Sequence, residues 1–298
     1  MRGGSVLAAC LAAALLAPAW ALATDEPFWN ARPLGYWLNQ LRVGDAAARE
    51  VAARGVSEIA TTHGSATVTA AVPLLMPCLD AVDAPLRAAA ADALAPIGVA
   101  ALSAGPRLLS LFEHDPDPGV RRSAGVAASR VIPASPALVT VAGRVLSGDD
   151  DSSVREVAAA ALVEAGSAAT AALPDARKAL GDSDPMVRLY SAAVVAKLGG
   201  AADAMPVLLS GLTSQDSPVR AESAGLLADV APGDARLVPA LVDALKDDDR
   251  LVRIAAADAL GTIGPPARAA MDPLWHMIHD PDDTVRERAL RALRLIKG

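Results

Sequence analysis

The sequence predicts an all-α fold, an α-solenoid of about eight stacked helix hairpins. Hydrophobic residues make up 53% of the 298 residues, which excludes a disordered chain, and aromatic residues make up only 3%. The core must therefore consist mainly of Ala, Val and Leu, and the β-branched and aromatic alternation that is typical of strands is scarce. The third observation is a short phrase that recurs along the chain with a nearly constant period.

This phrase is Asp-x-x-aliphatic-Arg, and it occurs eight times. Successive arginines are separated by 38, 34, 34, 33, 32, 33 and 33 residues. So regular a period indicates repeated helical units that bury their apolar faces against one another. The acids and arginines of the phrase, here named the repeat ladder, are Asp45 and Arg49, Asp83 and Arg87, Asp117 and Arg121, Asp151 and Arg155, Asp184 and Arg188, Asp216 and Arg220, Asp249 and Arg253, and Asp282 and Arg286.

Each arginine lies in the first turn of a predicted amphipathic helix. The acid stands at the N-cap, where a carboxylate accepts hydrogen bonds from free backbone N–H groups. One such helix is expected within residues 249–264, and its apolar positions follow the helical period at Val252, Ala256, Leu260 and Ile263. Glycines that favour a left-handed backbone are expected to end several of these helices, at Gly98, Gly166, Gly199 and Gly264.

A second apolar segment completes each unit. Residues 106–115, 204–212 and 240–247 are examples, and each is expected to form a shorter helix that runs back before the next acid. A single hairpin of this kind cannot bury its apolar face alone. Stacking of successive hairpins is therefore expected to form one continuous, elongated core.

The first 23 residues differ from the repeats. Arg2 precedes a short apolar run that ends in Ala21-Leu22-Ala23, a pattern typical of a secretory signal peptide cleaved before Thr24. The run is shorter than the ~20 apolar residues of a membrane helix. We therefore expect a protein exported to the periplasm or secreted, with no membrane span after cleavage. Cys10 lies in a sequence similar to a lipoprotein processing site, which leaves lipid anchoring as an alternative.

The predicted organisation is a signal peptide at 1–23, a lead-in at 24–33 and the solenoid at 34–298. The first repeat is atypical because bulky aromatic residues precede it. An end repeat must cover an exposed core, which these residues would do, although an aromatic ligand platform is an alternative. They are Phe28, Trp29, Tyr36 and Trp37. The last helix is strongly charged, as expected of a solvated closing helix.

The repeating unit of the chain resembles that of a known family. Residues 249–264, "DRLVRIAAADALGTIG", are similar to the HEAT repeat, especially to the bacterial HEAT-like units of phycobilisome lyases. The resemblance covers roughly residues 34–297 and implies a right-handed superhelix. It also implies that the ladder acids cap helices, that the ladder arginines reach acids or carbonyls of the adjoining repeat, and that the ladder helices line the concave side.

Charge and composition argue against several functions. Removal of residues 1–23 leaves 26 basic and 34 acidic residues, a net charge of −8, which disfavours nucleic acid and anionic membranes as partners. Cys78 then becomes the only cysteine and is expected to be a buried small hydrophobe. His276 and His279 share a helix face and could form part of a metal site, but a third ligand is not evident. No cofactor or catalytic residue is predicted.

The HEAT-like enzyme deoxyhypusine hydroxylase requires His-Glu dipeptides, and this sequence has none. We therefore predict a non-enzymatic scaffold that binds a protein or peptide along its concave face. The alternative is a lyase- or isomerase-like helper that acts on a cofactor or modification of a client protein. The residues predicted to bind are Val157, Tyr190, Glu222, Arg288 and Arg291. The first four belong to a row expected to face outward, one residue from each repeat: Val51, Ala89, Ser123, Val157, Tyr190, Glu222, Ala255 and Arg288.

Overall fold

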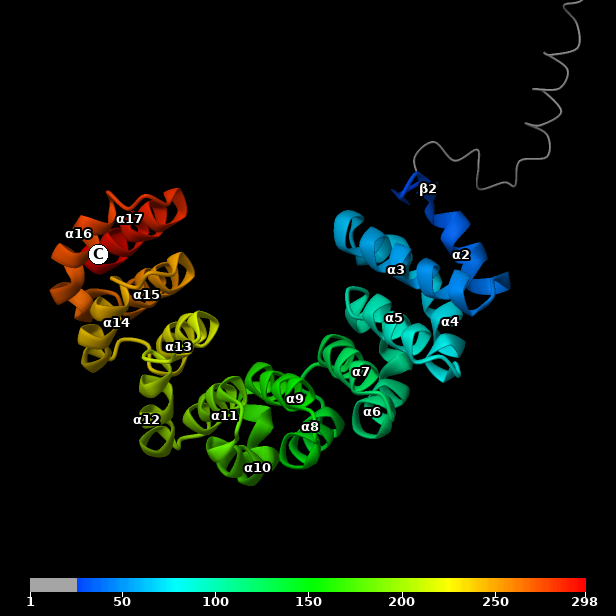
Figure 1. The fold of residues 1–298 in the computed structure, drawn as a ribbon, viewed down its shortest axis with the longest axis horizontal. Coiled ribbons are helices and arrows are strands. Elements are labelled where there is room, and N and C mark those ends of the chain that lie inside the picture. Colours follow the sequence, from blue (N-terminus) through cyan, green and yellow to red (C-terminus); the bar gives the residue numbers. More distant parts are fainter. Residues whose placement is uncertain (1–25) are drawn as a thin grey trace, which may run out of the picture. The chain divides into compact units, whose positions relative to one another are not determined.

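The computed structural model describes residues 26–298 (Figure 1). The predicted signal peptide and Cys10 lie outside the described residues. Within them, the chain is an all-α solenoid apart from one short β-hairpin. The chain divides into two compact units, which end and begin at residues 133 and 134.

The first unit begins with the β-hairpin and continues through helices and 3₁₀ segments (η). Its elements are β1 (Phe28–Trp29), β2 (Arg32–Pro33), α2 (Leu34–Val43), α3 (Ala46–His63), η2 (Ser65–Ala71), α4 (Val72–Leu75), η3 (Met76–Asp80), α5 (Ala84–Leu94), η4 (Gly98–Ala104), α6 (Gly105–His114) and α7 (Pro118–Val131).

The second unit contains five of the helices that carry the repeat ladder. Its elements are α8 (Pro136–Gly148), α9 (Ser152–Ala165), η5 (Gly166–Ala172), α10 (Leu173–Lys178), η6 (Ala179–Gly181), α11 (Pro185–Lys197), α12 (Ala201–Gly211), α13 (Ser217–Val230), η7 (Ala235–Leu237), α14 (Val238–Ala244), α15 (Arg250–Ile263), η8 (Pro265–Ala270), α16 (Met271–Met277) and α17 (Asp283–Lys297).

The helices that carry the repeat ladder, here named the ladder helices, form one row in each unit. In the second unit, α9, α11, α13, α15 and α17 contact one another in sequence, and each packs on a helix of a second row (Figure 1). The aliphatic residue of the phrase is buried in every described repeat beyond the first; Val154, Val187 and Val252 are fully buried. The predicted apolar face is therefore confirmed as the core.

Glycine ends several ladder helices, as predicted. Gly98, Gly166, Gly199 and Gly264 have φ values of 63°, 56°, 91° and 71°, which lie in the region that glycine adopts without steric cost. Beyond three of these glycines the returning segment starts as a 3₁₀ stretch, η4, η5 or η8, rather than directly as an α-helix. The second helices are consequently shorter than a simple hairpin would make them.

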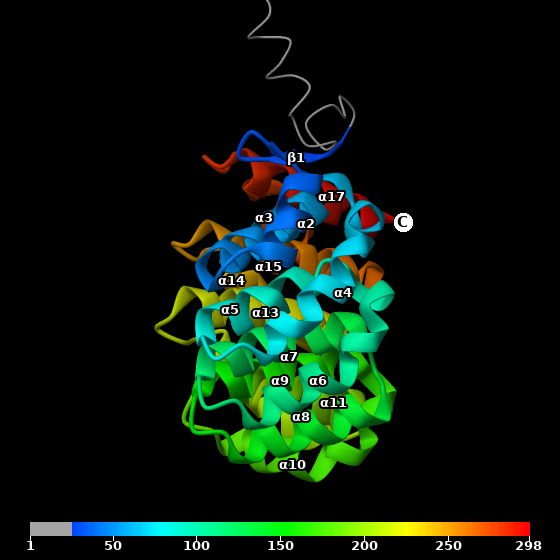
Figure 2. The ribbon, with the colours of Figure 1, turned by 90° about the vertical axis from the view of Figure 1, so that its right-hand side faces the viewer.

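The β-hairpin is the one departure from the expected helical structure. Phe28 pairs with Pro33 and Trp29 with Arg32, in an antiparallel register. Asn30 and Ala31 between them have φ values of 48° and 55°, the conformation of a two-residue turn whose twist suits paired strands. The hairpin lies at the N-terminal end of the first unit, beside α2 and α3 (Figure 2).

The hairpin and α2 bring the N-terminal aromatic residues together over the end of the core. Trp37 is 5% exposed and its indole N–H donates to the carbonyl of Arg32 at 3.2 Å. The ring centroids of Trp29 and Trp37 lie 5.2 Å apart. Both rings rest on the bare backbone of Gly55 in α3, where an added Cβ would come within 2.9 Å of Trp29 and 3.0 Å of Trp37. This arrangement covers the end of the core.

Candidate functional site

The ladder acids act at the N-termini of their own helices. Asp151 accepts hydrogen bonds from the backbone of Ser153 and Val154, and Asp184 accepts from Met186 and Val187. The ladder acids whose side chains accept such bonds are Asp45, Asp117, Asp151, Asp184, Asp249 and Asp282. In the part of the chain that the structure describes, Asp83 and Asp216 make no side-chain cap bond.

Replacing Asp184 by alanine should lower the free energy of unfolding by ~1 kcal/mol, because two backbone N–H groups of α11 lose their acceptor. Urea unfolding followed by circular dichroism measures the change. Asp216→Ala is the matched control, since Asp216 occupies the same N-cap position without a cap bond, and it should change the stability by a few tenths of a kcal/mol. Equal losses in the two variants would contradict the capping role.

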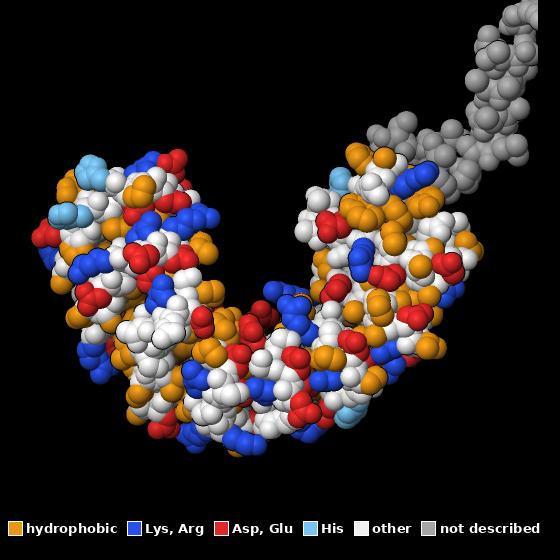
Figure 3. All heavy atoms as spheres, viewed as in Figure 1, with side chains coloured by type: hydrophobic (Ala, Val, Ile, Leu, Met, Phe, Trp, Pro, Cys, Tyr) orange, Lys and Arg blue, Asp and Glu red, His pale blue; other side chains and the backbone are white. Residues whose placement is uncertain are grey.

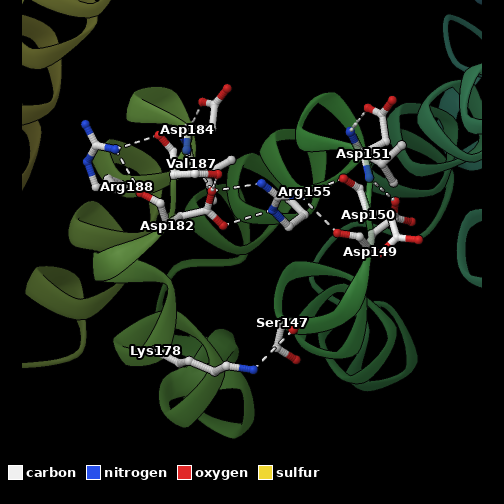
Figure 4. A network of polar contacts seen from close by, with 12 residues as sticks. Ser147, Asp149, Asp150, Asp151, Arg155, Lys178, Asp182, Asp184, Val187 and Arg188 are labelled. Atoms are coloured by element: carbon white, nitrogen blue, oxygen red, sulfur yellow. Dashed lines mark hydrogen bonds and ion pairs between the residues drawn. The ribbon is translucent and has the colours of Figure 1, made fainter.

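The ladder arginines join neighbouring repeats (Figure 4). Nε and Nη2 of Arg155 donate to the two carboxylate oxygens of Asp182, both at 2.9 Å. Its Nη1 donates to the backbone carbonyls of Asp149 and Asp150, in the turn before its own helix. The same forked pair joins Arg87 to Asp115, Arg220 to Asp247 and Arg253 to Asp280.

The fork partners are a second set of acids, to which the sequence pattern assigned no role. Each lies two residues before a ladder acid, and its Oδ1 also accepts the backbone N–H of that acid, as Asp182 does from Asp184 at 2.9 Å. The signal in the sequence is the repeated Asp-x-Asp at 115, 182, 247 and 280. Planar, two-point pairing of this kind fixes the orientation of both groups. Each forked pair of the ladder therefore joins one repeat to the next.

The row predicted to face outward is only partly exposed. Ala89 is 4% exposed and Ser123 is 8% exposed, so both are buried in the first unit and the prediction was wrong for them. Small side chains at these positions let neighbouring helices cover them. Val51 is 45% exposed, and Val157, Tyr190, Glu222, Ala255 and Arg288 are half-buried.

Tyr190 lies between two carboxylates on the ladder-helix row of the second unit. Its hydroxyl, on α11, hydrogen-bonds to Glu222 on α13, and the charge of Glu156 on α9 also acts on it. Burial raises the pKa of Tyr190, and the two carboxylates raise it further. The phenol therefore stays protonated near neutral pH and serves as a hydrogen-bond donor.

Two adjoining grooves run between the last three ladder helices. The groove between α13 and α15 has a floor of small residues, including Gly225 and Ala255, and Glu222 and Asp258 line it. The groove between α15 and α17 is lined by Asp258, Gly261 and Arg291, among others. Asp258 and Thr262 belong to both grooves.

Asp258 connects the predicted binding residues of this region. Its Oδ2 lies 3.5 Å from Nη1 of Arg288. Glu222 lines one of the two grooves that share Asp258, and Arg291 lines the other. Acidic and basic side chains lie interspersed over α15 and α17 (Figure 3). Asp258 was not among the residues predicted to bind, although it is the only acid in the Ala-rich helix α15, which was a usable signal. Val157, on α9, lines neither groove.

The structure does not assemble a metal site from the two histidines. Nδ1 of His276 bonds with the carbonyl of Asp272 at 2.8 Å. Of the acids that follow the two histidines, Asp280 is held by Arg253 and Asp282 caps α17. Over residues 26–298, no three His, Cys, Asp or Glu side chains gather in a group that could hold a metal ion.

Cys78 is 1% exposed, and burial raises the pKa of its thiol, which agrees with the predicted small hydrophobe.

Residues 152–181 are long and apolar enough to cross a membrane by length and composition. The chain turns within this segment, since α9 ends at Ala165 and Gly166 has a φ of 56°. At 14 residues, α9 alone is shorter than the ~20 that a span requires. Its apolar face packs on α8 and α11.

The model of the HEAT-repeat family matches the sequence twice, over residues 140–228 and 205–294. These matches together cover more than half of the chain.

The chain belongs to the HEAT-repeat family.

Solved structures show the same fold in other HEAT-like chains. A chain from the complex of CpcE and CpcF of phycocyanin lyase from Nostoc sp. PCC7120 is 20% identical, with a TM-score of 0.58 over 92% of this chain and 99% of that one. The YIBA protein of E. coli is 20% identical, with a TM-score of 0.54 over 87% of this chain and 92% of that one. No curated protein gives a significant match to this sequence. The TM-scores show a shared fold.

Proposed function

We propose that this HEAT-repeat protein is an exported, non-enzymatic scaffold that docks an extended protein segment on the ladder helices of its second unit. The supporting observation is the pair of grooves between α13, α15 and α17, which share Asp258 and Thr262. Ala and Gly make up a large part of their linings, so the backbone of a partner can approach closely, and charged side chains of both signs also line them. Apolar grooves with a few polar groups are typical of peptide recognition.

The half-buried residues around Tyr190 extend this surface toward α9. Tyr190 is held by Glu222 and presents an apolar ring between two acids. Rigid aromatic side chains that keep a polar tip are frequent anchors in protein interfaces. One structural neighbour is a chain of the CpcE and CpcF complex, and this supports the proposal that a chain of this fold has a protein partner.

Blocking the groove without harming the fold tests this function. Gly225 is exposed on α13, and no atom outside its immediate surroundings lies within 4 Å of an added Cβ. Gly225→Gln should stabilise the helix by ~0.5–1 kcal/mol and yet weaken partner binding at least tenfold, because the longer side chain occupies the groove. The partner is first identified by placing a photo-crosslinking residue at Leu295, an exposed position that lines the adjoining groove, in the native envelope. Affinity is then measured by titration calorimetry.

Gly148→Gln is the matched control. Gly148 lies at the end of α8, in the other row of helices, and it likewise has no atom within 4 Å of an added Cβ. This variant should bind the partner as tightly as the unchanged protein does. Equal affinities for the two glutamine variants would refute the docking face. A purified mature chain that carries a tetrapyrrole or stoichiometric zinc would instead favour the lyase- or isomerase-like alternative.

A further inference from the structure

The forked pairs of the ladder define the geometry that a ladder arginine presents to the next repeat. In the second unit, Nε and Nη2 of Arg220 donate to both oxygens of Asp247 at 2.6 and 2.8 Å. Nη1 of the same arginine donates to the carbonyls of Ser214 and Gln215, at 2.8 and 3.0 Å. The carbonyls hold the guanidinium in place, and the remaining two donors point at a carboxylate.

At the junction of α11 and α13 the carboxylate is replaced in the sequence. Ser214 stands two residues before Asp216, where the other forked pairs have aspartate. Its hydroxyl oxygen accepts the backbone N–H of Asp216 at 3.2 Å. This bond copies the one that Asp182 accepts from Asp184. Ser214 therefore preserves the turn but brings no acid to the arginine.

Arg188, the arginine of this junction, nevertheless keeps the orientation of the ladder. Its Nη1 donates to the carbonyls of Asp182 and Ser183 at 2.8 and 2.9 Å. Figure 4 shows the remainder of the guanidinium directed away from Asp182. Across residues 26–298, Nε and Nη2 of Arg188 have no hydrogen-bond or ion-pair partner. The side chain is half-buried and reaches solvent.

We propose that the Nε and Nη2 donors of Arg188 bind a carboxylate that comes from outside this chain. The guanidinium is already fixed by two carbonyls, so little side-chain entropy is lost when the carboxylate pairs at two points. The bound group would take the place that the side chains of Asp182, Asp247 and Asp280 take at the other forked pairs. This site lies at the N-terminal ends of the ladder helices and is independent of the proposed docking face.

The nearby acid of α13 does not prevent such binding. Asp216 is the N-cap residue beside this site, and equivalent acids stand beside the complete pairs. Asp117 acts on Arg87 and Asp249 acts on Arg220, and each pair still holds its aspartate. One guanidinium among two carboxylates is therefore an arrangement that this fold already contains.

A second incomplete pair does not offer the same site. Ala81 replaces the aspartate that would serve Arg49 in the first unit. Nε of Arg49 is buried without a partner, and Nη2 donates to the carbonyl of Arg42 at 3.4 Å. Because its Nε is closed off from solvent, Arg49 cannot present both donors to a ligand. The binding experiment must therefore report on Arg188 separately from Arg49.

Titration of the mature chain with sodium acetate at constant ionic strength tests the site. The arginine Nε–H groups are followed by NMR, and the signal of Arg188 is assigned by its loss in Arg188→Lys. The Arg188 signal should shift saturably, and Ser214→Asp should abolish the shift because its own carboxylate fills the fork. Ser214→Ala is the matched control and should retain the response. No shift in the unchanged protein, or an equal shift in Ser214→Asp, would overturn the proposal.

A comparison of peptides and acetate identifies the source of the carboxylate. A short peptide with a free C-terminus, its C-terminally amidated form and acetate are compared by the same Arg188 signal. Affinity at least tenfold higher for the free-acid peptide identifies a protein C-terminus, whereas equal affinity for acetate identifies a small free carboxylate. An amidated peptide without acidic side chains that binds as tightly as the free acid would contradict carboxylate recognition.

Discussion

Replacing Arg87 by methionine should lower the free energy of unfolding of the first unit by about 3–5 kcal/mol. The side chain of Asp115 is 3% exposed, and Nε and Nη2 of Arg87 donate to it at 2.7 and 2.8 Å. Methionine fills much of the same volume but leaves a buried carboxylate without its counter-ion. Hydrogen exchange of the amides in α5, α6 and α7 measures the loss within this unit.

Two further variants show whether the buried charge causes the loss. Arg286→Met removes the same kind of carbonyl contacts at the last repeat, where the acid partner, Asp283, is 90% exposed, so it should cost less than about 1 kcal/mol. In Arg87→Met combined with Asp115→Asn, the charge is absent and part of the stability should return. A double variant as unstable as Arg87→Met would show that packing, rather than charge, dominates.

The effect of Arg87 should also depend on pH. Burial tends to raise the pKa of Asp115, but the hydrogen bonds from Arg87 and from the backbone of Asp117 outweigh it and hold the pKa below its ordinary value of 3.8. The pair therefore contributes its full stability above pH 3.8 and loses it as the pH falls through the lower, folded-state pKa. In Arg87→Met, protonation relieves the unpaired charge, so the difference between the two proteins should shrink in acid.

Replacing Trp37 by alanine should destabilise the N-terminal repeat by about 3–5 kcal/mol, the range for loss of a buried large aromatic side chain. Trp37 is 5% exposed, packs on Gly55 and Trp29, and donates from its indole to the carbonyl of Arg32. Its removal leaves a cavity at the end of the core. Hydrogen exchange should report the loss in α2 and α3.

Phe28→Ala is the control for this aromatic cluster. Phe28 is 64% exposed, so its truncation should change the stability by no more than about 0.5 kcal/mol. Unchanged hydrogen exchange in α2 and α3 of Trp37→Ala would contradict the end-cover interpretation.

The helices, their caps and the buried aliphatic positions were predictable because each depends on residues a few positions apart. Val187 and Val252, for example, follow directly from the helical period. The fork partners were harder to predict, because Arg155 and Asp182 are 27 residues apart and several acids stand in each turn. Only the packing of one repeat on the next selects the acid that meets the guanidinium.

The exposed surface was less predictable for the same reason. Helical spacing placed Ala89 and Ser123 on the outward row, but neighbouring side chains cover both. The groove between α13 and α15 arises where small residues such as Gly225 leave space between helices, whereas Gly261 lets α17 pack closely against α15. The existence of both grooves depends on the separation of α13, α15 and α17, which a single repeat does not encode. Asp258 gained its place at both grooves from this packing.

The reach of each forked pair bears on how the gene can change. Arg155 and Arg253 each join their own repeat only to the following one, over 27 residues in both cases. A tandem duplication of one whole repeat would therefore supply its own arginine, its own aspartate and its own capped helix start, and the new boundary between repeats would match the old one. Duplication or loss of half a repeat would leave an arginine or an aspartate without its partner. The lineage of such a chain can thus change length in whole repeats, with each copy free to acquire a different outer surface.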